Sequence, residues 1–262
     1  MRIVSAGQAV FAATLVAIGI LGLIKGDLVA IWQLGPKGVP AREGLAYRCA
    51  AISVAAGVGL LWQRAAGAAA RVLLAYLLIW FVLFKAPVIF RAPGRMVSWE
   101  DGAETCAIVA AAWVLYAGRA TGWDRQRLGF ATGERGVRIA RTLYGLALIT
   151  FGLAHFAYLK ETAALVPAWL PSHRAWALFT GCAYLAAGVA VTSGVCARRA
   201  AALSAVQMGT FTLLVWGAIL AAGPKDAFQL NESLISLTLT ASGWVVTDSY
   251  GLMSWLRRRL RS

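Results

Sequence analysis

Long, continuous runs of apolar residues, separated by short polar or basic gaps, dominate the sequence. A helix needs about 20 mostly apolar residues to span a bilayer. The runs are continuous and do not alternate with a period of two, so they do not indicate a transmembrane β-barrel. An open sheet edge in lipid would also leave backbone groups unpaired, so the runs predict helices. The predicted spanning segments are 8–25, 45–62, 71–90, 103–118, 139–159, 174–193, 199–222 and 232–250.

The two halves of the chain resemble each other. Three matches share a single offset along the chain, namely 55–58 (AAGV) with 186–189, Pro93 with Pro224, and Trp113 with Trp244. We call this the repeat offset. Gly19 matches Gly152 at a slightly longer offset. Four crossings return each half to its starting side, so the repeats are parallel and are related by an axis along the membrane normal.

The pattern therefore predicts an all-α integral membrane protein with eight transmembrane helices, arranged as two parallel-repeated four-helix bundles. The first unit covers 1–118 and the second, with its Arg-rich tail, covers 139–262. A polar, basic and glycine-containing linker, predicted to be cytoplasmic, joins them over 119–138. The apolar stretch 9–24 is like a signal peptide, but it has no clear cleavage site and has a counterpart in the second half. We therefore expect it to be retained.

Composition and charge favour the same class. Hydrophobic residues make up 60% of the 262 residues and charged residues only 14%, whereas soluble domains are about 45–50% apolar and 25% charged. The 25 Lys and Arg against 11 Asp and Glu give a net charge of +14. These basic residues lie in short gaps beside apolar runs, as anchors against anionic lipid do. This arrangement indicates membrane lipid as a partner and argues against nucleic acid.

Basic residues also predict the orientation. With the N-terminus in the cytoplasm, 15 of the 25 basic residues fall inside, all of them arginine, and eight of the 11 acids fall outside. Cytoplasmic loops are enriched in Lys and Arg. The bias favours a multi-pass protein of the inner (plasma) membrane with both termini in the cytoplasm.

Cysteines and histidines provide little redox or metal chemistry. The four cysteines, Cys49, Cys106, Cys182 and Cys196, form no C-x-x-C pair, so a dithiol enzyme is not indicated. His155 and His173 are the two histidines, and no cluster has the spacing of metal ligands. The sequence therefore argues against haem and against a bound metal.

The first outer loop of each half is apolar and contains one tryptophan and two prolines. These loops cover 28–40 and 164–171, with Trp32 and Trp169 as their tryptophans. Proline interrupts a helix, and tryptophan prefers the membrane interface. We expect both loops to lie at the outer surface as caps over their units.

The second half carries a further resemblance. It contains 152–156 (GLAHF), then 166–171 (VPAWLP), then Thr180-Gly181 and 186–188 (AAG). These motifs resemble the DoxX-like family of four-helix membrane proteins over 139–250, and residues 8–118 match more loosely, with Gly22 where His155 stands. The family includes a membrane subunit of a thiosulfate–quinone oxidoreductase. The resemblance therefore implies a membrane fold and an accessory role in a quinone-linked redox system.

His155 is the first candidate ligand-binding residue. It lies about 16 residues into an outward-running helix, and an ionisable group inside a membrane is a functional candidate. Its imidazole could relay a proton or hydrogen-bond a quinone carbonyl. The alternative is a structural bond to a carbonyl of the loop 164–171.

Four further residues complete the candidate set. Lys85 and Glu104 stand near the outer ends of adjacent helices in the first half, where we expect an ion pair. Tyr158 and Trp169 lie near His155 along the chain, although interfacial anchoring is the alternative for Tyr158.

The sequence leaves three functions open. The first is an accessory subunit that contacts quinone and a redox protein. The second is a non-catalytic membrane assembly or partner protein, and the third is a small-molecule transporter. No phosphate loop, nucleophile elbow or dinucleotide motif specifies a reaction.

Overall fold

A computed structural model of the chain describes residues 5–32, 40–223 and 226–259, without the side chains of 252–259. These residues are helical with connecting turns, and no strand occurs among them. Six of the described helices are long and apolar enough to cross a membrane. They are α1 (Ala6–Lys25), α2 (Arg42–Leu61), α3 to α4 (Ala66–Arg91), α7 (Gly133–Ala157), α9 (His173–Ser193) and α10 to α11 (Ala197–Ala221). The chain is thus a helical protein of the membrane class.

Two of these long helices are interrupted by π-helical segments. The third helix of the chain comprises α3 (Ala66–Trp80), η2 (Phe81–Lys85) and α4 (Ala86–Arg91), and its counterpart comprises α10 (Ala197–Phe211), η4 (Thr212–Gly217) and α11 (Ala218–Ala221). The remaining elements are η1 (Ala30–Trp32), α5 (Met96–Ala117), α6 (Gly122–Arg127), η3 (Gly129–Ala131), α8 (Leu159–Ala164) and α12 (Ala227–Arg259).

The polar segment 119–138 is more structured than a linker. It contains α6 and η3, and α7 begins within it, at Gly133. Thr121 caps α6, since its hydroxyl accepts from the Asp124 backbone N–H and the Asp124 carboxylate accepts from the Thr121 N–H. Such a reciprocal cap satisfies two donors that would otherwise lack partners at the start of a helix.

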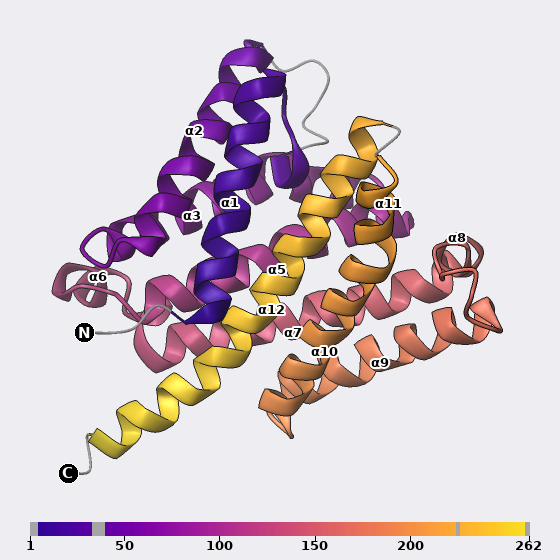
Figure 1. Cartoon of the computed structure of the whole chain (residues 1–262). Helices are drawn as coiled ribbons and strands as arrows, with labels where there is room; N and C mark the ends of the chain where they lie inside the picture. The colour runs from indigo at the N-terminus through magenta and orange to yellow at the C-terminus, as the bar shows by residue number, and fades with distance from the viewer. Residues whose placement is uncertain (1–4, 33–39, 224–225, 260–262) are drawn as a thin grey trace.

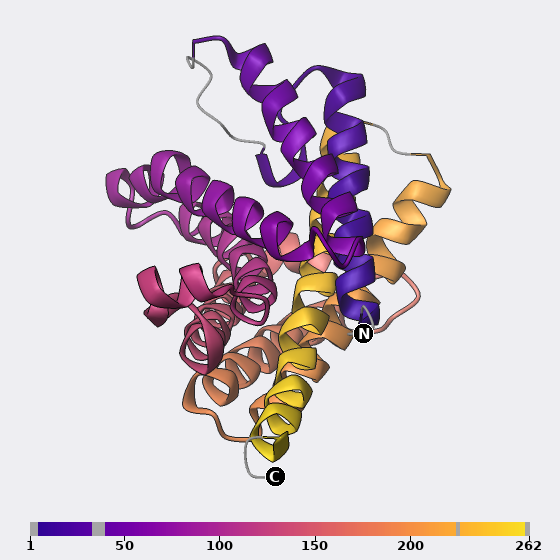
Figure 2. The ribbon, with the colours of Figure 1, turned by 90° about the vertical axis from the view of Figure 1, so that its left-hand side faces the viewer.

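Helices pack in the same order in both halves. In the first half α1 contacts α2, α2 contacts α3 and α3 contacts α5, and in the second half α7, α9, α10 and α12 contact one another in that sequence. Two further contacts, α5 with α7 and α12 with α1, close the order into a ring, and α5 also packs on α12. In Figure 1 the two chain ends and α6 lie at the left, and α8 lies at the right. Figure 2 shows the same helices from the side.

Small residues let the first two helices of each half approach closely. A Cβ on Gly57 of α2 would lie 2.6 Å from the Ala12 carbonyl oxygen of α1, and a Cβ on Gly188 of α9 would lie 2.7 Å from the Gly145 oxygen of α7. Helices in lipid associate through such close van der Waals packing. These glycines therefore act in packing.

The two π segments start at Phe81 and Thr212, which are related by the repeat offset. In the first half Pro87 follows the segment at the start of α4. A proline inside a helix lacks an N–H and clashes with the carbonyl four residues earlier, and a widened turn relieves that clash. In the second half Ala218 stands at the position of Pro87, and the Thr212 hydroxyl bonds the Met208 carbonyl and the Ser236 hydroxyl instead.

The first outer loop differs from expectation. Trp32 is only 1% exposed, and its indole N–H donates to the Ser53 hydroxyl at 2.9 Å. Its ring lies edge-on to the rings of Tyr76 and Trp80, with centroids 5.4 and 5.2 Å away. Trp32 is therefore not exposed at the surface of the protein, because the aromatic rings and Ser53 supply both apolar contact and a hydrogen-bond acceptor in the core. Residues 33–39 of this loop lie outside the described residues.

Candidate functional site

Lys85 forms the best-defined charged contact near one end of the first half. Its Nζ donates to Asp101 Oδ1 at 2.6 Å, and its side chain is only 3% exposed. The π segment η2 ends at Lys85, and α5 provides Asp101. The sequence had suggested Glu104 as the partner, but the ion pair that forms is with Asp101, one turn earlier on the same helix.

Further carboxylates surround this pair, and we call Lys85, Glu100, Asp101, Glu104 and Glu232 the charged cluster. Glu104 is half-buried and interacts electrostatically with the other three acids and with Lys85. Glu232 comes from α12, so the cluster joins the two halves where α5 packs on α12. Within the described part of the chain, no group of three or more His, Cys, Asp or Glu is arranged to hold a metal ion. The cluster brings four acidic side chains to one lysine, and the sequence analysis did not anticipate that Asp101 and Glu232 would belong to it.

His155 lies on a different helix pair. The half-buried imidazole places Nδ1 2.8 Å from the Phe151 carbonyl oxygen, one turn earlier in α7. Its ring meets that of Tyr184 edge-on at 5.3 Å. Because a carbonyl oxygen only accepts, Nδ1 carries the hydrogen, and Nε2 of the neutral ring is an acceptor. The structural partner of His155 is thus its own helix, and not the loop 164–171.

Tyr158 and Trp169 lie outside the charged cluster that contains Lys85 and Glu104. Tyr158 is the half-buried residue that ends α7, and Trp169 is 71% exposed in the turn before α9. The five candidates of the sequence analysis therefore fall into two places, the charged cluster and the α7–α9 pair.

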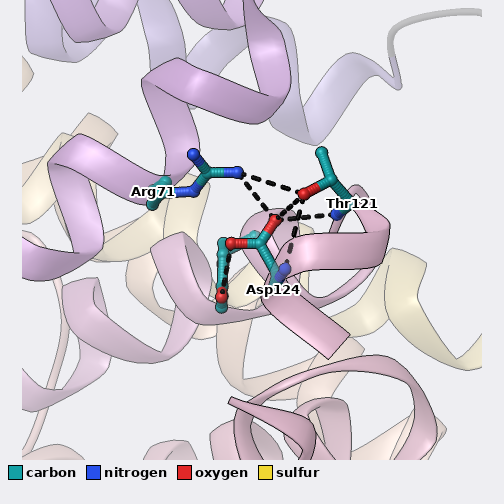
Figure 3. A network of polar contacts seen from close by, with 4 residues as sticks. Arg71, Thr121 and Asp124 are labelled. Atoms are coloured by element: carbon teal, nitrogen blue, oxygen red, sulfur yellow. Dashed lines mark hydrogen bonds and ion pairs between the residues drawn. The ribbon is translucent and has the colours of Figure 1, made fainter. Parts of the chain in front are cut away.

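A polar network at the opposite end of the first half was not anticipated (Figure 3). The side chain of Asp124 is 1% exposed and accepts from Arg71 at 2.7 Å. It also accepts from the Thr121 backbone N–H and hydroxyl, both at 2.7 Å, and from the Tyr116 hydroxyl at 3.2 Å. The network fastens α6 to α3. The T-x-x-D spacing of Thr121 and Asp124 is a helix-start signature that could have revealed it.

Burial alone would raise the pKa of Asp124, but the hydrogen bonds outweigh it. Those from Thr121, Arg71 and Tyr116 together lower the pKa from 3.8 to about 2. The carboxylate is therefore ionised at neutral pH, and it holds the Arg71 guanidinium at the surface between α3 and α6.

Comparison with known proteins gives one partial match. A family described as a domain of unknown function (DUF8561) matches residues 144–227. The matched segment runs from within α7 to the first residue of α12 and covers less than half of the 262-residue chain. No curated protein and no solved structure matches the chain.

Proposed function

We propose that the chain crosses the bilayer eight times as a tandem of two DoxX-like four-helix units. The common offset of the π segments, the matching glycine contacts and the repeated packing order support this architecture. Helices α5 and α12, with 22 and 33 residues, supply the seventh and eighth crossings, since about 20 residues span the hydrocarbon core.

The proposed orientation places both termini in the cytoplasm at the inner (plasma) membrane. It can be tested with an impermeant maleimide after replacing the native cysteines. A cysteine at Gly129, beside α6, should react only in permeabilised cells, and one at Gly94, between α4 and α5, should react in intact cells. A Cβ at either glycine meets no atom within 4 Å, so both substitutions should be tolerated. Labelling of Gly129→Cys in intact cells would show that the orientation is the opposite of the proposed one.

As a function, we propose an accessory subunit of a quinone-linked membrane redox system. The observation that carries this proposal is the state of His155. Its Nδ1–H is bonded to Phe151, and among the described residues Nε2 has no partner. An acceptor nitrogen suits the hydroxyl of a quinol better than the carbonyl of a quinone. His155 would therefore hold the quinol and accept one of its two protons, while the second proton passes to water and a partner protein takes the two electrons.

Quinol binding tests this role. Titration of a short-chain quinol into purified protein should quench tryptophan fluorescence saturably, and His155→Gln should weaken binding about tenfold, as loss of a strong hydrogen bond does. The matched control is His173→Gln, which removes the other histidine at the start of α9 and should leave affinity unchanged. If both variants bind the quinol as tightly as the parent protein does, His155 does not bind the quinol.

A second candidate is a non-catalytic partner or assembly protein, and the charged cluster favours it. It places four acidic side chains of α5 and α12 beside one ammonium, so a basic segment of another membrane protein would find carboxyl partners there. Mild-detergent affinity purification should recover a fixed companion that is lost from Glu104→Gln/Glu232→Gln but kept by the exposed control Glu43→Gln. Recovery of the same companion from all three would exclude the cluster as its binding surface.

A further inference from the structure

Two open cavities occupy corresponding positions in the two halves, away from both candidates described above. The first, of about 530 Å³, lies where α3 begins, and the second, of about 500 Å³, lies where α10 begins. Six lining positions are related by the repeat offset: 63 with 194, 66 with 197, 67 with 198, 68 with 199, 71 with 202, and 119 with 250. The helix packing thus builds the same hollow twice.

Three arginines line the first cavity, and none of its lining residues is acidic. Arg71 is held by Asp124 at 2.7 Å (Figure 3). Arg119 is held through hydrogen bonds to the Leu115 carbonyl and the Gln8 side chain. Arg64 is exposed in the α2–α3 turn. Two guanidinium groups are thus fixed in place and a third is free to close on a ligand, which favours an anion with several oxygens.

The first turn of α3 supplies backbone donors among the lining residues. Ala66 and Ala69 donate their N–H groups to the Trp62 and Ala65 carbonyls, but the N–H groups of Gly67 and Ala68 have no partner among the described residues. Both residues line the cavity, and no side chain caps α3. A helix start carries a partial positive charge and suits phosphate.

Arginines also line the second cavity, but they come from different positions in the repeat. Arg198 and Arg199 line it from the uncapped first turn of α10. Tyr250 also lines this cavity, and behind it the Arg141 guanidinium, which is not a lining residue, lies 3.7 Å from the centroid of the Tyr250 ring. Tyr250 corresponds to Arg119 at the repeat offset, and Arg141 corresponds to Gln8 at the longer offset that relates Gly19 to Gly152. Each half therefore has one arginine in this contact. In the first half it is Arg119, which bonds Gln8 of α1, and in the second half it is Arg141 of α7, which packs on Tyr250 of α12.

The buried hydroxyl of Tyr250 has no hydrogen-bond partner among the described residues. Tyr250 lies beside Arg141 and lines the same cavity as Arg198 and Arg199, and the proposed topology puts this end of α10 among the inner headgroups. Basic pockets between helix ends bind lipid headgroups. We propose that each cavity binds the phosphate of one anionic phospholipid headgroup, so that the chain carries two such lipids at corresponding positions.

Lipid titration with native mass spectrometry tests the proposal. The purified full chain is delipidated in detergent and titrated with phosphatidylglycerol, and two tightly bound molecules per chain are expected. Phosphatidylcholine, whose headgroup has no net charge, should bind at least tenfold more weakly.

Charge-removing variants assign the sites. Arg64→Gln should weaken one of the two sites about fivefold, and Arg198→Gln/Arg199→Gln should weaken the other about 25-fold, at about fivefold for each interfacial arginine. These arginines are exposed, so folding should persist. The control Arg125→Gln removes an exposed arginine from α6, outside both cavities, and should change neither site.

Three outcomes would overturn the proposal. They are equal binding of the two lipids, loss of affinity in Arg125→Gln as large as in the cavity variants, and displacement of phosphatidylglycerol by millimolar inorganic phosphate. Displacement would identify free phosphate as the ligand of the arginines. Retention of both lipids in the presence of phosphate would support the headgroup assignment. None of these results depends on quinol binding, so this proposal and the redox role fail separately.

Discussion

The two halves of the molecule share a packing order but use polar residues differently. In the first half, Trp32 enters the core and Lys85 is buried against Asp101. In the second half, Trp169 is exposed, and Trp216 stands at the position that the repeat offset assigns to Lys85. The close glycine contacts are kept in both. The comparison teaches that backbone approach defines the scaffold, while the charged and aromatic side chains on it can change.

The outer-loop tryptophans give the largest expected contrast. Trp32→Ala should lower the free energy of unfolding by about 4 kcal/mol, because it leaves a cavity in the core and the Ser53 hydroxyl without its donor. Trp169→Ala should change it by less than about 0.5 kcal/mol, as exposed positions do. Denaturant titration in detergent, followed by far-UV circular dichroism, measures both. A similar loss in the two variants would show that the loops are equivalent after all.

The buried ion pair gives the next effect. Lys85→Met should cost about 3 kcal/mol because it leaves the Asp101 carboxylate without its counter-charge. The double variant Lys85→Met/Asp101→Asn should recover most of that loss. The exposed Lys160 of the second half is the control, and Lys160→Met should be neutral. If the double variant is no more stable than Lys85→Met, the pair is not the reason for the loss.

The glycine contacts should respond alike in the two halves. Gly57→Ala and Gly188→Ala should each cost about 2 to 3 kcal/mol, because the added Cβ overlaps a carbonyl oxygen of the neighbouring helix. Gly129→Ala is the matched control, since a Cβ there meets nothing within 4 Å. Thermal unfolding in detergent compares the three variants. A loss in one half alone would break the correspondence between the halves.

The smallest expected effect concerns the network around Asp124, which fastens α6 to α3 in the first half. Its pKa is lowered from 3.8 to about 2, so it contributes about 2 kcal/mol of stability. That contribution is complete above about pH 4 and is lost as the pH falls from 3.8 toward 2. The stability difference between the parent protein and Asp124→Asn should therefore shrink over this range. A difference that stays constant from pH 5 to pH 2 would contradict the assignment, and Glu43→Gln is the control.

The sequence by itself determined the membrane class and the positions of the six long apolar helices. A spanning helix must satisfy its backbone internally and present about 20 apolar residues to lipid, and both demands are local. The helix α6 was missed, although its Thr121–Asp124 cap is also a local signal.

Only the tertiary structure decided which side chains meet. Lys85 was expected to pair with Glu104, and its ion pair is with Asp101; Trp32 was expected at the interface, and it lies in the core. The two basic cavities likewise bring together residues as distant as Gln8 and Arg119. Such contacts depend on the register and crossing of helices far apart in the chain. Hydrophobic periodicity records which face of a helix is apolar, but not which residue of another helix will lie against it.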